Sequence, residues 1–235
     1  MALQYLVREW KLSNRFWLLV LVAPAAAFLL VAIPLRAGAA PGQENALAAC
    51  APAVTACAAA LGLVFFSTLS NLSYGFNFAV QMSVRRRDYV LSAFLLHVLY
   101  VAMAVAETLL LSLVFSLAAG ERTALAYLGD WLPWIAAATP LVIGMGWLTG
   151  AVLQRFGVTA YTAIWMAILF GGMLFSRLGK WAYTDGAGTA AGMAVQGVGN
   201  AFLGLGMHGI QILMALAGAA FCLGSWAVQR KQEVR

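Results

Sequence analysis

The feature of this sequence that most restricts its fold is a series of long apolar runs. A helix needs about 20 mostly apolar residues to cross a bilayer. Lys and Arg number only 14 and Asp and Glu only eight in 235 residues, too few for the surface of a soluble domain of this length. We therefore predict an all-α polytopic membrane protein, a single transmembrane domain over residues 1–235 with six transmembrane helices. The six apolar runs are 16–35, 47–71, 90–118, 131–153, 158–177 and 208–228, with a tight turn between the fourth and fifth at Gln154 to Gly157.

The distribution of Lys and Arg predicts the orientation, because cytoplasmic loops carry an excess of these residues. With both termini in the cytoplasm, ten basic residues lie inside: Arg8, Lys11, Arg15, Arg85, Arg86, Arg87, Arg155, Arg230, Lys231 and Arg235. Four lie outside: Arg36, Arg122, Arg177 and Lys180. We predict a multi-pass protein with cytoplasmic N- and C-termini. The same rule accounts for the net charge of +6, so we do not expect nucleic acid as a partner.

Residues 1–15 have the pattern of a helix that lies on a membrane. Their apolar residues share one helical face, and a basic stripe lies beside it: Leu3, Leu6, Val7 and Trp10, then Arg8, Lys11 and Arg15, with Glu9 between. We expect an amphipathic helix in the cytoplasmic interface, in contact with the lipid bilayer. The alternative is a simple extension of the first span.

The segment 178–207 is too long for a tight turn and carries no charge from Gly186 to Met207. We expect a re-entrant or interfacial pair of short helices on the outer side, because irregular backbone at membrane depth must be covered by protein. The predicted hinge is Gly197 to Asn200, and Gly197, Gly199 and Asn200 are candidates for an outer gate. The alternative is a seventh span, which would put the basic C-terminus outside.

Two titratable residues fall inside the third run, Glu107 near its middle and His97 near its inner end. A carboxylate is costly in lipid, so Glu107 should face protein or a water-filled cavity. It could serve cation coupling or line a substrate path, or it could be a protonated Glu bonded to a neighbouring helix. His97 lies ten residues earlier and is not expected on the same face.

Motifs of catalysis and cofactor binding are missing from the sequence. It contains no GxxxxGK[ST] phosphate loop, no HExxH and no GxSxG. Its three cysteines do not have metal-ligand spacing. We predict no catalytic residue, no metal site and no cofactor bound by this chain.

The most polar internal connection is the segment 73–89, which ends in the basic cluster Arg85-Arg86-Arg87-Asp88. A helix over 88–118 would be about 45 Å long, whereas the hydrocarbon core is about 30 Å thick. The excess should project into the cytoplasm next to this cluster. A charged loop at that position suits contact with a soluble partner.

This layout resembles the membrane subunit of a type-2 exporter of the ABC transporter superfamily, in particular the short bacterial permeases linked to bacitracin and lantibiotic resistance. The entry to the first span is similar to theirs: Glu9-Trp10-Lys11-Leu12, then Asn14-Arg15 and Phe16. The segment 73–89 is similar to their coupling helix: Gly75-Phe76 through Ser83-Val84-Arg85-Arg86-Arg87-Asp88-Tyr89.

The resemblance implies an ATP-driven exporter in the bacterial inner or plasma membrane, with a second permease subunit, identical or related, and two ATP-binding subunits. ATP and Mg would bind those partner chains, and the segment 73–89 would dock on them. On this hypothesis Arg85, Arg86 and Arg87 position the docking; alternatively, they are ordinary anchors at the cytoplasmic membrane edge. The cargo would be amphipathic or hydrophobic, such as a peptide antibiotic, drug or lipid.

Two other classes of function remain open. The chain could be an anchor or assembly subunit for a soluble enzyme, which would explain the basic contact but not the segment 178–207. An intramembrane enzyme using Glu107 and His97 is less compatible with the missing motifs and the different helix faces.

Overall fold

The computed structural model describes residues 16–38, 46–71, 86–119 and 125–230, and within these ranges it contains helices and turns but no strand. The helices are α2 (Phe16–Gly38), α3 (Ala46–Ser70), α5 (Arg86–Ala119), α6 (Leu128–Tyr183), α7 (Ala190–Gly204) and α8 (Gly206–Arg230). Six helical stretches in the described part are long and apolar enough to cross a membrane, two of them in α6. The all-helical prediction with six candidate spans is confirmed at this level.

The helix α6, which contains two of these stretches, has a break in its backbone at Gly157. This residue has φ 77° and ψ −175°, a conformation that is essentially restricted to glycine. The predicted tight turn at Gln154 to Gly157 therefore takes the form of a sharp kink between two helical halves. The second half continues to Tyr183, beyond the predicted end at residue 177.

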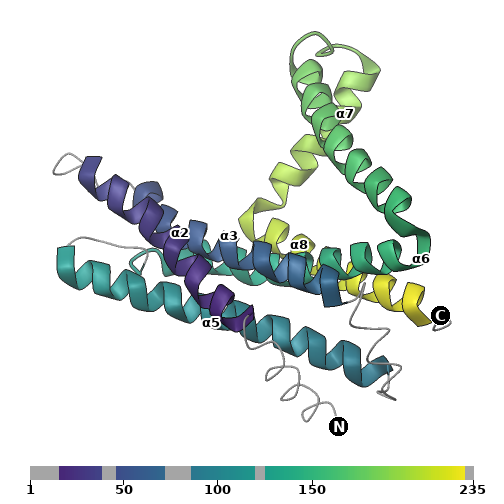
Figure 1. Cartoon of the computed structure of the whole chain (residues 1–235). Helices are drawn as coiled ribbons and strands as arrows, with labels where there is room; N and C mark the ends of the chain where they lie inside the picture. The colour runs from purple at the N-terminus through teal and green to yellow at the C-terminus, as the bar shows by residue number, and fades with distance from the viewer. Residues whose placement is uncertain (1–15, 39–45, 72–85, 120–124, 231–235) are drawn as a thin grey trace.

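A bundle forms from α2, α3, α5, the first half of α6 and much of α8 (Figure 1). Its buried core draws one or more side chains from four of these helices, including Val20, Val64, Tyr100 and Ile143. The helix α5 has 34 residues, about 51 Å at 1.5 Å per residue, so it exceeds the thickness of a hydrocarbon core of about 30 Å. The expectation of a long third helix is confirmed.

Glycines bring α6 and α8 close together. A Cβ atom built on Gly218 would lie 2.5 Å from the carbonyl oxygen of Pro140, and one built on Gly144 would overlap the carbonyl oxygen of Gly218. Small residues of this kind let the backbones of membrane helices approach each other directly. This contact holds the last helix against the bundle.

Several polar residues lie among the apolar residues of the bundle interior, and apolar residues also cover the outside. Buried hydroxyl groups bond to the backbone of their own helix, as Thr108 does to the carbonyl of Ala104 and Thr149 to that of Met145. Large apolar side chains such as Leu30 and Leu117 are more than 70% exposed. A soluble protein covers its outside mainly with polar residues, whereas a lipid-facing surface should be apolar.

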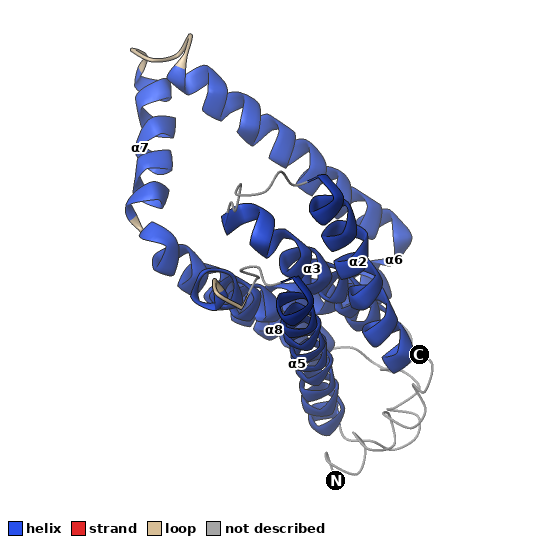
Figure 2. Cartoon of the chain, turned by 90° about the vertical axis from the view of Figure 1, so that its left-hand side faces the viewer, coloured by secondary structure: helices blue, strands red, loops and turns tan. Residues whose placement is uncertain are grey.

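The second half of α6 and α7 form a hairpin that projects away from the bundle in both views (Figures 1 and 2). From Tyr161 to Trp181, no residue whose burial is described is buried. The hairpin closes through a turn at 184–189 and meets α8 at Gly206, where φ is +65°. We call residues 158–205 the hairpin arm.

The predicted hinge in the segment 178–207 is wrong. Gly197, Gly199 and Asn200 lie within α7, which is helical without interruption from Ala190 to Gly204. Thr189 caps its N-terminus by accepting a hydrogen bond from the Gly192 backbone N–H at 3.0 Å. Each helical residue adds one backbone hydrogen bond, and this continuity outweighs the low helix propensity of the glycines.

Candidate functional site

The predicted coupling segment is only partly inside the described residues. The residues outside them are Gly75, Phe76 and Arg85. The first turn of α5 contains Arg86, Arg87, Asp88 and Tyr89. Asp88 is half-buried at the helix N-terminus, where a negative charge is favourable.

Tyr89 has a role that the sequence did not suggest. Its side chain is only 3% exposed, and its hydroxyl donates a hydrogen bond of 2.7 Å to the backbone carbonyl of Asn71. Asn71 is the last described residue before the segment 72–85, and Tyr89 follows that segment closely. The two helices are therefore joined by a hydrogen bond next to the ends of the predicted coupling segment.

His97 forms a second link between the same helices, and its side chain is fully buried. Its Nδ1 atom lies within hydrogen-bond distance of the Ala93 carbonyl oxygen. Its Nε2 atom lies 3.0 Å from Ser67 Oγ and 3.4 Å from the amide nitrogen of Asn71. We call His97, Ser67 and Asn71 the polar cluster.

For a neutral imidazole, these contacts define the direction of each hydrogen bond. A carbonyl oxygen can only accept, so Nδ1 of His97 carries a proton and donates to Ala93. In the neutral imidazole Nε2 is then an acceptor, which is filled by the hydroxyl of Ser67. The amide nitrogen of Asn71, also a donor, lies farther from the same atom, at 3.4 Å, and shares its single lone pair. A neutral His97 thus holds two side chains of α3 in defined orientations.

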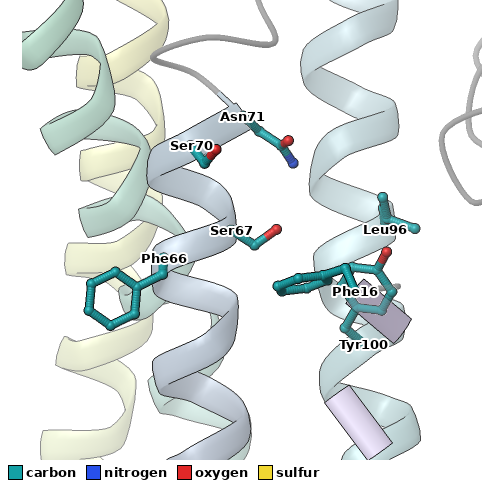
Figure 3. A pocket seen from close by; sticks show the side chains of 7 residues that line it. All are labelled: Phe16, Phe66, Ser67, Ser70, Asn71, Leu96 and Tyr100. Atoms are coloured by element: carbon teal, nitrogen blue, oxygen red, sulfur yellow. The ribbon is translucent and has the colours of Figure 1, made fainter. Parts of the chain in front are cut away.

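A pocket of about 290 Å³ lies beside the polar cluster, between α3 and α5 (Figure 3). Aromatic and aliphatic groups form one part of its wall, and short polar side chains form the other. The ring centroid of Phe16, at the start of α2, lies 5.3 Å from that of Tyr100. The lining residues are Phe16, Phe66, Ser67, Ser70, Asn71, Leu96 and Tyr100.

Sequence reasoning identified His97 but missed the α3 side of this site. The overlooked signal is the spacing of Ser67, Ser70 and Asn71, which are i, i+3 and i+4 and therefore share one face at the end of an apolar run. Which helix that face meets is a property of the packing.

Glu107 is half-buried further along α5, and its Oε2 atom is covered without a hydrogen-bond partner among the described residues. Its neighbour Thr108 is fully buried and accepts a weak bond from the Cys57 thiol at 3.9 Å. The structure does not bring Glu107 into the polar cluster around His97.

The candidate gate residues are fixed to the rest of the hairpin arm. Tyr183 donates a hydrogen bond of 3.2 Å to the side-chain oxygen of Asn200, and a Cβ atom on Gly199 would touch the same hydroxyl at 3.3 Å. Gly197 has open space at its Cβ position. The amide nitrogen of Gln196 also donates to the carbonyl of Ala182 at 2.6 Å. These contacts join α7 to the end of α6.

The predicted interfacial helix lies outside the described residues, and so do its residues Arg8, Glu9, Trp10, Lys11 and Arg15. Within the described ranges, no three His, Cys, Asp or Glu side chains gather closely enough to hold a metal ion. No family model, no curated protein and no solved structure matches this chain.

Proposed function

We propose that this chain is the permease subunit of an ATP-driven ABC exporter of type 2. It would pair with a second permease subunit, identical or related, and bind two separate ATP-binding subunits on its cytoplasmic side. Those subunits would hold ATP and Mg, and the cargo would be amphipathic or hydrophobic. The six candidate spans and the apolar outer surface support a membrane subunit.

The observation that carries the proposal is the joining of α3 and α5 beside the segment 73–89. Tyr89 bonds to the Asn71 carbonyl, and His97 bonds to Ser67. A force applied to the intervening segment would reach both helices together, because these bonds oppose their separation. The length of α5 supports the same reading, since a helix of about 51 Å can extend past the membrane surface.

The mechanical role follows from this geometry. ATP-driven closure of the partner subunits would displace the segment 73–89, and α3 and α5 would carry the displacement through the membrane. Arg85, Arg86 and Arg87 would position the docking through their charge. The continuous α7 and the positive φ of Gly206 at its end make Gly206, in place of residues 197–200, the candidate pivot of an outer gate.

The test is purification of the tagged chain from its native membrane in mild detergent, with identification of what accompanies it. A stoichiometric ATP-binding subunit that is lost in the triple variant Arg85/Arg86/Arg87→Ala is the expected result. The control is Arg230/Lys231/Arg235→Ala, which removes the same charge from the same predicted side and should retain the subunit.

Two results would contradict the proposal. One is a preparation without an ATP-binding subunit, or with a soluble enzyme in its place, which would favour the anchor function. The other is equal loss of the subunit in both triple variants, because the contact would then depend on general charge and not on the coupling segment.

A further inference from the structure

The pocket between α3 and α5 has separate polar and apolar sides. Ser67, Ser70 and Asn71 lie on successive turns at the end of α3, with Ser67 and Asn71 directed toward α5 (Figure 3). Phe16, Leu96 and Tyr100 supply apolar surface across from them. Ligand sites in proteins typically combine an apolar lining with a few polar groups that converge.

The polar cluster decides what the polar side offers to a ligand. The hydroxyl proton of Ser67 is committed to Nε2 of His97, so the oxygen of Ser67 presents its lone pairs to the pocket. Asn71 directs its amide nitrogen to the same His97 atom, which leaves its amide oxygen as an acceptor. The pocket therefore offers hydrogen-bond acceptors.

Charge narrows the class of ligand further. None of the described residues that line the pocket is charged. A carboxylate or phosphate would lack a cation, and an ammonium group would lack a counter-ion, so either charge would lose its hydration without compensation by an opposite charge. An uncharged group that carries a donor, such as a hydroxyl or an amide N–H, has partners at Ser67 and Asn71.

We propose that this pocket binds an uncharged amphipathic molecule through a hydrogen-bond donor on its head group, with its apolar part against Phe16, Leu96 and Tyr100. His97 is a positioning residue in this site, because it acts on the ligand only through the orientation of Ser67. The binding is a property of this chain alone, and it goes beyond the coupling to an ATP-binding subunit.

The test uses octan-1-ol with a photoreactive diazirine at its third carbon, added to the purified chain in detergent. After illumination, mass spectrometry measures the labelled fraction of the peptides that contain residues 66–71 and 96–100. We expect labelling at these peptides, and we expect competition by unlabelled octan-1-ol to exceed that by octyl methyl ether, which has no donor, and by octanoate, which is anionic.

Two variants of the lining should reduce the labelling. Ser67→Ala removes an acceptor and should lower it by about fivefold to tenfold, the effect of one hydrogen bond. Leu96→Trp fills the apolar part and should abolish it. Thr55→Ala is the control on the same helix, since Thr55 is exposed and its hydroxyl donates to the Ala51 carbonyl of its own helix at 2.7 Å. It should label as the parent chain does.

The positioning role has its own readout. In His97→Leu the hydroxyl of Ser67 is released and can donate to the pocket, so the preference for octan-1-ol over octyl methyl ether should diminish. An unchanged preference in a folded His97→Leu variant would overturn that role.

The site itself is overturned by any of three results. These are absence of label from both peptides, equal competition by the alcohol and the ether in the parent chain, or undiminished label in both Ser67→Ala and Leu96→Trp. Elution as a single symmetric peak in size-exclusion chromatography shows that a variant is folded. If Leu96→Trp is not folded, the labelling of Ser67→Ala alone tests the site. The experiment contains no ATP-binding subunit. The pocket proposal can therefore fail while the proposed permease function stands, and the permease function can fail while the pocket proposal stands.

Discussion

The close contact between α6 and α8 leads to a quantitative prediction for Gly218→Ala. The added Cβ atom would lie 2.5 Å from the Pro140 carbonyl oxygen, so the two backbones must move apart by about 1 Å to restore ordinary contact. A gap of that size forfeits a quarter to a half of the dispersion energy of the atom pairs that line it. We expect a loss of about 2–3 kcal/mol, within the range observed for overpacked cores.

The control is Gly224→Ala on the same helix. Its Cβ atom would lie 3.8 Å from the Leu148 side chain, which is ordinary van der Waals contact. Alanine is favoured over glycine in a helix by up to about 1 kcal/mol, so this variant should be unchanged or slightly more stable. The two substitutions are chemically identical and differ only in what the new methyl group meets.

The assay is unfolding by sodium dodecyl sulfate in mixed micelles, followed by tryptophan fluorescence, for which the chain supplies eight tryptophans. The unfolding equilibrium of Gly218→Ala should shift by about 30- to 140-fold, at 1.4 kcal/mol for each factor of ten. Gly144→Ala should act in the same way, because its Cβ atom would overlap the carbonyl of Gly218.

The double variant provides a stricter test. Once the helices have separated for one methyl group, the second costs less, so the effects of Gly144→Ala and Gly218→Ala should sum to more than the effect of the pair. Equal stability of Gly218→Ala and Gly224→Ala would refute the reasoning, since it would mean that the backbones of α6 and α8 do not meet at this point.

Two further predictions concern the hairpin arm. Gly157→Ala should destabilise the fold by about 1–3 kcal/mol, because φ 77° with ψ −175° is essentially closed to alanine. Gly171→Ala, which also places its methyl group in open space, should not destabilise the fold. Unfolding in sodium dodecyl sulfate compares the two variants, and equal stabilities would argue against the kink. Gln196→Ala removes the 2.6 Å hydrogen bond to the Ala182 carbonyl, so amide hydrogen exchange in the turn 184–189 should accelerate by about tenfold. An unchanged exchange rate would show that this bond does not hold the hairpin together.

Much of the secondary structure could be predicted because it depends on local composition. A run of about 20 apolar residues with few charges must satisfy its own backbone hydrogen bonds in a membrane, and a helix does so within the segment. The six candidate spans and the break before Val158 are consequences of this kind. The error at Gly197 to Asn200 came from reading glycine as a break, although α7 continues through these residues.

The candidate site was only half visible in the sequence. His97 stands out as a titratable residue in an apolar run, whereas Ser67 and Asn71 are ordinary polar residues near the end of a span. Their importance comes from facing His97 across 26 to 30 residues of sequence, which depends on how α3 and α5 are rotated about their axes.

The glycines separate most clearly what the sequence determined from what only the tertiary structure decided. In the sequence, Gly171 and Gly172 indicate a close helix contact as well as Gly144 and Gly218 do. In the structure, a Cβ atom on Gly171 or Gly172 would meet open space. The sequence determined that these residues lie in apolar helices, because helix formation in a membrane is a local matter of backbone hydrogen bonding. Only the tertiary structure decided that Gly144 and Gly218 touch a backbone, because a close approach requires a particular position and rotation of two helices at once.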